Sequence, residues 1–480
     1  MTIIQNVGAT VVANNWDRFG GRVLHILNGY VLSLKLGCNF VFYWPNDHRF
    51  PEMEEQVNFF SQEFINNHRI GTCPAVEEIH LINFNSFDSI EGMRFINHTD
   101  GLAYFKDHDF FSLPKFTDED ESHAREFYAE TAKSVMSPAV KLLWEKLRQS
   151  YSGIEAIHGR YGDLVNGSFC QYVDTGKYID TLSIKTLVEK LVKGNKQVVI
   201  LSDTPEISRA LEKIMHIKLI PVESRASKTR NITYFELQTI ELLILALSEN
   251  IYAPSHSAFS ILASRLGNVP IKSIRQETGD ILVSMPKGHL RRRFYSKFDR
   301  RVRMQIKSRD LLSVLQFYWK SLDFDVVISL IHDAHESDNE YVYSLCLEAL
   351  IAKIDKNSKR SLILVKKAES LARTRINIHH DPLVLTLLVK WCLLKNDSLK
   401  ETEEIKKEIS DLYPYQFSKQ NVLDFIVKSE TLKFEINLAS QTQTSNIGIW
   451  NEIVNSEENE LIYGLLTFLQ KKELLINSSK

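Results

Sequence analysis

The chain has 480 residues, and because domains of roughly 150 residues are typical, this length predicts two or three domains. Apolar residues make up 44% and charged residues 25%, which excludes collagen-like, wholly disordered and fully membrane-embedded proteins. The 58 Lys and Arg against 60 Asp and Glu leave a net charge of −2, so no global field attracts nucleic acid or anionic lipid. Any such partner needs a local basic patch.

The cysteines and the N-terminal sequence bear on the compartment. Five cysteines are spread thinly and form no C-x-x-C pair, which predicts reduced thiols and argues against a zinc knuckle or redox motif. The first 21 residues lack a basic stretch followed by a long apolar core, and no run of about 18 uncharged apolar residues occurs anywhere. We therefore expect a cytoplasmic protein with neither a signal peptide nor a membrane span.

The first regular elements are predicted near the N-terminus. Apolar residues recur at helical spacing from Val23 to Leu36, Gly37 is a typical helix stop, and the apolar run Phe40 to Tyr43 predicts a strand. The region from about 46 to 135 is richer in aromatic residues and contains short apolar runs such as Ile79–Ile82. The sequence therefore predicts a loop, a helix and a strand at the start of an α/β domain.

From Gly153 onward, strands alternate with helices. The predicted strands cover Ile154–His158, Gln197–Leu201, Ile217–Val222 and Asn250–Ala253. The predicted helices cover Leu182–Lys193, Pro205–Met215, Tyr234–Leu247 and Phe259–Leu266. This alternation is typical of a parallel, doubly wound sheet, which binds ligands at the carboxyl ends of its strands.

The character of the sequence changes after about residue 285. The segment 287–309 contains ten Lys or Arg residues and one acid, Asp299. It is read as a solvated face, as an anchor for anionic membrane or pyrophosphate-linked acceptors, or as a nucleic-acid patch, and its aromatic residues favour the membrane surface over nucleic acid.

The remainder of the chain shows helical periodicity. Three blocks resemble helix pairs and recur at roughly 35 to 40 residues: Leu311–Ala334, Tyr341–Leu371 and Pro382–Tyr413. They fit either a helical solenoid or an irregular helical appendage. The predicted domains are therefore 1–145 and 146–285, both Rossmann-like, and 286–480, a basic linker followed by an all-α region.

Polar residues follow the first strand of the second domain. His158 and Arg160 stand at the predicted strand end, before Gly162 and Asp163. The Arg160 guanidinium offers a planar fork that can hold a diphosphate, and Gly162 permits close approach of the backbone. The alternative interpretation is a capped, salt-bridged strand end.

Two further strand ends carry polar residues. Ser202 and Asp203 follow a buried strand, where Asp203 can cap the next helix, accept hydrogen bonds from a nucleobase or ribose, or do both. The segment from Ser255 to Ser260 ends another strand and opens a helix with three serines. Free amides and hydroxyls at a helix N-terminus make an anion site, and simple N-capping is the alternative.

The order of these three strand ends resembles the GT-B fucosyltransferase superfamily, which includes bacterial α-1,2-fucosyltransferases, the nodulation α-1,6-fucosyltransferase and the protein O-fucosyltransferases. The matching residues are His158, Arg160, Gly162 and Asp163, then Ser202 and Asp203, then Ser255, Ser257, Phe259 and Ser260. The N-terminal Arg18-Phe19-Gly20-Gly21 resembles the family's opening R-[FL]-G-N-Q loop, with Gly21 where Asn is common. The resemblance covers roughly residues 10 to 275.

The resemblance implies an inverting, metal-independent glycosyltransferase that needs no cofactor. Its donor is a nucleotide sugar, most simply GDP-fucose, and its acceptor is a hydroxyl of a glycan or a lipid-linked oligosaccharide in surface polysaccharide synthesis. Residues 1–145 then form the acceptor side and 146–285 hold the donor. Departure of the diphosphate requires a fixed cation or a metal, and Arg160 with the 255–260 helix start supplies the former. A helical scaffold with a relic nucleotide-binding domain is the alternative.

Metal ions are the other means of stabilising a diphosphate. Asp107-x-Asp109, Asp118-x-Asp120 and Asp323-x-Asp325 read D-x-D, a pattern that metal-dependent sugar transferases use, and His379-His380-Asp381 could also contribute ligands. Because about one such pair is expected by chance among 24 aspartates, we predict no metal site. A solvated loop is the preferred interpretation of the His379-His380-Asp381 segment.

The general base is the least defined part of the site. An inverting transfer needs a base opposite the departing diphosphate, hence on the first domain. Asp17, beside Gly20 and Gly21, is the first candidate, and His25 is the second. The competing interpretation is that Asp17 caps the following turn.

Overall fold

The computed structural model describes the chain in segments. They are residues 10–14, 19–44, 54–71, 80–82, 102–105, 113–115, 119–159, 178–202, 211, 233–254, 257–283, 300–374, 381–394, 398–411, 461–462 and 464–469. The chain forms two compact units. One contains Met1–Gly159, Val188–Leu201 and Ile217–Glu277, and the other contains Arg160–Leu187, Ser202–His216 and Thr278–Lys480.

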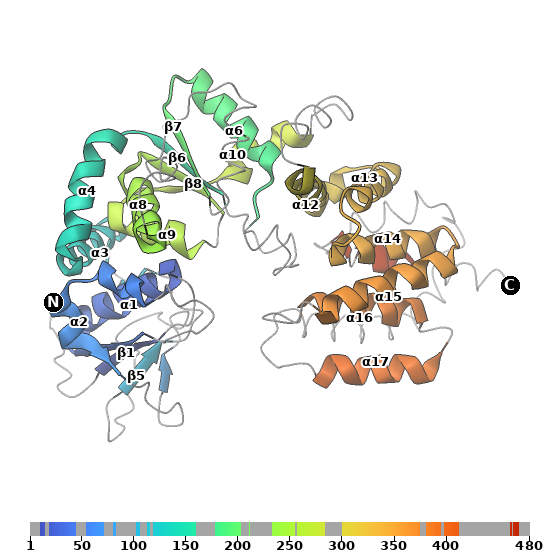
Figure 1. Cartoon of the computed structure of the whole chain (residues 1–480), viewed down its shortest axis with the longest axis horizontal. Coiled ribbons are helices and arrows are strands. Elements are labelled where there is room, and N and C mark those ends of the chain that lie inside the picture. Colours follow the sequence, from blue (N-terminus) through green and yellow to red (C-terminus); the bar gives the residue numbers. More distant parts are fainter. Residues whose placement is uncertain are drawn as a thin grey trace. The chain divides into compact units, whose positions relative to one another are not determined.

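The first sheet has five parallel strands in the order β3-β2-β1-β5-β4 (Figure 1). Their bounds are β1 Thr10–Asn14, β2 Asn39–Tyr43, β3 Arg69–Ile70, β4 His80–Ile82 and β5 Leu102–Phe105. Helix α1 (Phe19–Leu36) joins β1 to β2 and ends before Gly37, whose φ of 63° is readily adopted by glycine. The predicted helix and strand of this region are confirmed.

Two short and two longer helices are also described in the first region. They are the 3₁₀ helix η2 Glu55–Phe59, α2 Gln62–His68, α3 Glu121–Val135 and α4 Pro138–Tyr151. The side chain of Ser137 accepts a hydrogen bond from the Val140 amide, and Pro138 occupies the first turn of α4. Both features favour a helix start at this point.

The second sheet has the order β7-β6-β8-β9, and β8 pairs in parallel with both β6 and β9. Its strands are β6 Glu155–Gly159, β7 Val198–Ser202, β8 Asn250–Ala253 and β9 Ile271–Ser273. All residues of β6, β7 and β8 are buried, as expected for a parallel sheet covered on both faces. The α/β character predicted for both regions is confirmed.

Three helices of the second region follow the prediction: α6 Thr181–Lys193, α8 Tyr234–Leu247 and α9 Ala258–Gly267. A fourth, α10 Ile274–Val283, was not predicted. The start of α8 is fixed by a capping box, in which the Thr233 hydroxyl accepts from the Glu236 amide and the Glu236 carboxylate accepts from the Thr233 amide. The predicted helix Pro205–Met215 and strand Ile217–Val222 fall mostly or wholly outside the described residues.

Helices α8 and α9 pack against each other at very short range. A Cβ atom added at Gly267, the last residue of α9, would overlap the carbonyl oxygen of Ala246 on α8. Asn268 then ends α9 in the left-handed conformation, with φ of 53°. The backbones of α8, which precedes β8, and of α9, which follows it, are therefore in direct contact at Gly267.

In the described part of the C-terminal region, the helices form three pairs, as the periodicity predicts. The pairs are α12 Arg300–Tyr318 with α13 Phe324–Ser337, α14 Val342–Ile354 with α15 Ser358–Thr374, and α16 Asp381–Leu394 with α17 Leu399–Asp411. Consecutive helices pack together, and α14 also packs against α16 of the next pair. This neighbour-to-neighbour packing is typical of stacked helical hairpins. No helix among the described residues is long and apolar enough to cross a membrane.

The last cation of the basic run lies inside the helical region. Arg309 is 3% exposed, pairs with Asp338 at 2.8 Å, and stacks over the Tyr341 ring at 3.3 Å from its centroid. It therefore does not contribute to a basic surface, contrary to the expectation for the whole segment 287–309, because Asp338 and Tyr341 supply its partners within the fold. Residues 287–299 lie outside the described residues.

A buried carboxylate joins α12 to the segment before α6. Asp310 accepts hydrogen bonds from the Tyr178 hydroxyl at 2.6 Å, from the Thr181 amide at 3.0 Å and from the Thr181 hydroxyl. Asp180, close by, accepts from the amide and hydroxyl of Ser183, both at 2.7 Å. Burial, followed by the charge of Asp180, raises the pKa of Asp310 to about 7.

This carboxylate should make stability depend on pH. The folded state holds the Asp310 proton more tightly than the unfolded state does. The resulting stabilisation of the folded state is therefore fully present below about pH 4 and is lost as the pH rises to 7. We expect the stability of the wild type relative to Asp310→Asn to fall by roughly 1 kcal/mol or more over this window. Denaturant unfolding at several pH values measures it. Asp411→Asn, at an exposed carboxylate, is the control, and a pH-independent difference would contradict the assignment.

Candidate functional site

The order of the second sheet defines where a ligand can bind. From β6 the chain passes through α6 to β7, on one side of β6, whereas β8 lies on the other side. The point between β6 and β8 is therefore a topological switch point, and open α/β sheets bind ligands at the carboxyl ends of the strands there. His158 lies at this end of β6, and β8 ends at Ala253, shortly before Ser257.

His158 and two serines meet at this edge. The Nδ1 atom of His158 lies 2.7 Å from the Ser260 hydroxyl and 3.5 Å from the Ser257 hydroxyl. Ser257 is also the N-cap of α9, because its hydroxyl accepts from the Ser260 amide at 3.3 Å. The first and third sequence motifs, about 100 residues apart, are thus joined by hydrogen bonds at the start of a helix.

Phe259 connects this cluster to the N-terminal motif. Its ring centroid is 5.4 Å from that of His158 and 6.5 Å from that of Phe19. A Cβ atom added at Gly20 would lie 2.9 Å from the Phe259 Cα atom, so only glycine allows α1 to begin so close to α9. Gly21 follows, buried in the first turn of α1. The structure therefore places part of the Arg18-Phe19-Gly20-Gly21 motif against the third motif.

The second motif is described only in part. Ser202 is the last residue of β7 and is 4% exposed, and β7 is the neighbour of β6 in the sheet. The remaining predicted site residues lie outside the described residues: Asp17, Arg18, Arg160, Gly162, Asp163, Asp203 and Ser255. Of the predicted set, the structure brings together His158, Ser257, Phe259, Ser260 and Gly20.

His25 is not a suitable general base. It lies within α1 and is completely buried, and this burial lowers the pKa of its imidazole to about 4. A ring that is completely buried cannot reach an acceptor hydroxyl. The suggestion of His25 as second candidate is therefore wrong, because the first part of α1 is buried on all sides, which sequence position alone did not reveal.

Three of the aspartates considered as metal ligands fall among the residues whose side chains are described. Asp120 caps α3 by accepting from the Ser122 amide at 2.6 Å, and Glu119 forms an ion pair with Lys35. Asp323 is the N-cap residue of α13, and Asp325 lies in its first turn. Among the described residues, no three metal-ligating side chains form a group. Asp107, Asp109, Asp118, His379 and His380 lie outside the described residues.

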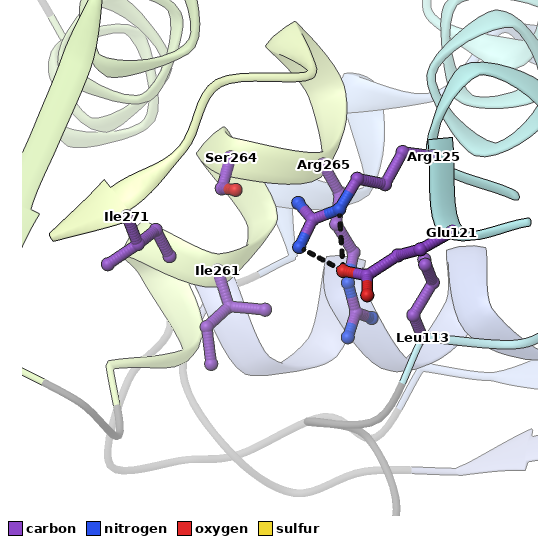
Figure 2. Close-up of a pocket in the computed structure, with 7 residues that line it drawn as sticks. All are labelled: Leu113, Glu121, Arg125, Ile261, Ser264, Arg265 and Ile271. Carbon is purple, nitrogen blue, oxygen red and sulfur yellow. Dashed lines mark hydrogen bonds and ion pairs between the residues drawn. The ribbon is translucent and has the colours of Figure 1, made fainter. Parts of the chain in front are cut away.

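Sequence reasoning missed one concave site. A pocket of about 310 Å³ lies at α3, α9 and β9 and is lined by two arginines, Arg125 and Arg265, together with Leu113, Glu121, Ile261, Ser264 and Ile271 (Figure 2). The two arginines are 140 positions apart in the sequence. The only local signal is a cation, Arg265, within an otherwise apolar stretch of α9.

Two comparisons with known proteins find no counterpart: no protein-family model matches the chain, and no curated protein matches it.

Proposed function

We propose that the protein is an inverting, metal-independent glycosyltransferase of GT-B architecture. It transfers a sugar, fucose from GDP-fucose, to a hydroxyl of a glycan or lipid-linked oligosaccharide. The single observation that carries this proposal is the meeting of His158, Ser257 and Ser260 at the topological switch point of the second sheet. Cytoplasmic polysaccharide synthesis at the inner face of a membrane is the setting that fits this acceptor class.

The helix start at Ser257 suits a diphosphate. The first amides of a helix that follows a strand point toward the ligand edge, and the positive end of the helix dipole favours negative charge. Ser257 and Ser260 are buried, and their hydrogen bonds to each other and to His158 fix the helix start, so that its amides are placed for the diphosphate. Arg160 comes directly after Gly159, the last residue of β6, and supplies the fixed cation in this proposal.

The remaining roles follow from chain position. Ser202 ends β7, Asp203 follows it, and both bind the nucleoside, while Gly162, Asp163 and Ser255 complete the donor site. Asp17 is the general base: it comes three residues after the end of β1, the strand flanked by β2 and β5 at the switch point of the first sheet. No cofactor or metal takes part in this mechanism.

Nucleotide binding in the absence of metal tests the proposal. A ligand that binds only the folded state stabilises it by about 2.7 kcal/mol at one hundred times its Kd. We expect GDP to raise the melting temperature by a few degrees in excess EDTA and equally in Mg²⁺, with UDP and CMP weaker. Differential scanning fluorimetry measures all three nucleotides on the full chain.

Each alternative gives a different result in this experiment. Stabilisation by UDP or CMP but not by GDP would exclude the fucosyl donor while leaving a transferase. Stabilisation by GDP only when Mg²⁺ or Mn²⁺ is present would exclude the metal-independent mechanism. No stabilisation by any nucleotide would favour a helical scaffold, in which the three helix pairs carry the function.

A further inference from the structure

The pocket between α3, α9 and β9 has the dimensions of a small ligand site. Its volume of about 310 Å³ lies at the lower end of the range for small-molecule sites, roughly 300 to 1,000 Å³. It does not include His158, Ser257 or Ser260. Figure 2 shows the guanidinium groups of Arg125 and Arg265 on the same side of the pocket, facing Ile261 and Ile271.

Arg265 is held rigidly at the base of the pocket. Its side chain is almost entirely buried, Nη1 donates to the Asn28 Oδ1 atom at 2.6 Å, and its guanidinium carbon lies 5.4 Å from the centroid of the Tyr128 ring. Asn28 and Tyr128 are neutral side chains, and these contacts orient the guanidinium. A pre-oriented guanidinium binds an anion with little loss of side-chain freedom.

Arg125 is the adjustable partner. Its Nε and Nη2 atoms donate to the Glu121 Oε1 atom at 3.0 and 2.7 Å, one helical turn away on α3. The two side chains are 35% and 58% exposed, and exposed pairs of this kind contribute little and exchange readily. An incoming anion can therefore take the place of Glu121 on Arg125.

The charges around the pocket favour an anion. Its described lining carries two guanidinium groups against one carboxylate. The pKa of Arg265 is lowered, mainly by burial and additionally by the positive charge of Arg125, which shows that the two cations repel each other. Asp120 caps the amide of Ser122, so the start of α3 is already occupied. Negative charge between the two arginines relieves their repulsion.

The opposite wall is apolar. Leu113, Ile261 and Ile271 supply hydrocarbon surface, and the Ser264 hydroxyl donates to the Val269 carbonyl at the end of α9. We infer that this pocket binds a small organic anion, with a carboxylate or phosphate head group between Arg125 and Arg265 and a compact apolar body against the isoleucines. This inference is independent of the proposed transferase activity.

Calorimetry on the full chain tests this site with defined probes. Isovalerate carries a carboxylate on a branched apolar body, isovaleramide is its neutral counterpart, and inorganic phosphate carries only the head group. We expect isovalerate to bind at least tenfold more tightly than isovaleramide, because a charged hydrogen bond is lost in the amide. Tighter binding of phosphate than of isovalerate would identify a phosphate-bearing ligand and retain the site.

Two variants with opposite expected effects separate binding from a structural role. Arg125→Gln should weaken isovalerate or phosphate binding by about tenfold or more, whereas Glu121→Gln should strengthen it by removing the competing carboxylate. Arg373→Gln is the control, because Arg373 forms the same one-turn pair with Glu369, together with an ion pair to Glu408, and belongs to the other compact unit.

The outcomes are exclusive. Weakening in Arg125→Gln, strengthening in Glu121→Gln and no change in Arg373→Gln would establish the anion site. Equal affinity for isovalerate, isovaleramide and phosphate, no binding of any probe by the wild type, or equal effects of all three variants would overturn it. Arg125 and Glu121 are partly exposed, so these substitutions leave the fold intact.

Discussion

Replacing Arg160 by alanine is expected to lower the rate of sugar transfer by roughly a hundredfold or more. The guanidinium is the fixed cation that the proposed mechanism provides for the departing diphosphate, whose charge grows in the transition state. A charge-assisted hydrogen bond is worth about 1.5 to 3 kcal/mol in binding, and each 1.4 kcal/mol is tenfold in rate. Release of GDP from GDP-fucose in the presence of oligosaccharide acceptors measures the effect.

The control for this variant is Arg148→Ala, at an exposed position on α4. We expect it to retain wild-type turnover, so that loss of a surface arginine is not itself the cause. A folded Arg160→Ala protein with nearly normal turnover would remove Arg160 from the mechanism. The helix start at Ser257 would then have to stabilise the diphosphate without it.

Replacing Gly267 by alanine is expected to cause the largest loss of stability, roughly 3 kcal/mol or more. The added Cβ atom would overlap the carbonyl oxygen of Ala246, and backbone atoms in two packed helices cannot move aside without separating α8 from α9. Because α9 also carries Ser257 and Ser260, the displacement should reduce GDP binding as well. Urea unfolding monitored by circular dichroism gives the change in the free energy of unfolding.

Gly71→Ala is the matched control for this substitution. A Cβ atom at Gly71 meets nothing within 4 Å, so we expect a change within about 0.5 kcal/mol. Equal stability of the two variants would show that the contact between α8 and α9 is not as close as described. The comparison uses the same chemical change at both positions and therefore isolates the packing.

The elements that sequence patterns predicted best are those with strong local determinants. The bounds of α8 and β8 agree with the prediction, because an apolar helix with a capping box at Thr233 and a fully buried strand both have local signatures. The short strands β3, β4 and β5 were not predicted as strands. Their pairing depends on neighbours far along the chain, and runs of two to four residues carry too little periodicity.

In the candidate site too, some features could be predicted from sequence patterns and others depend on residues far along the chain. The order of the motifs correctly anticipated that His158 and Ser260 lie at one edge, since parallel strands bring their carboxyl ends together. The burial of His25 and of Arg309 was not anticipated, because it depends on elements distant in the sequence that cover these stretches of α1 and α12 on nearly all sides. The pocket at Arg125 and Arg265 arises only when α3 packs against α9, a contact without a local signature.

The buried network at Asp310 has a consequence for how this chain can change during evolution. Tyr178 and Thr181 donate to Asp310 although more than 120 residues separate them from it. Recombination that exchanged residues 286–480 as one block would remove Asp310, the acceptor of both hydroxyls. Each hydrogen bond lost in this way would lower stability by about 1 to 3 kcal/mol. The helical pairs are thus inherited together with the segment that begins α6, and substitutions at Asp310 and Thr181 are expected to be correlated among descendants.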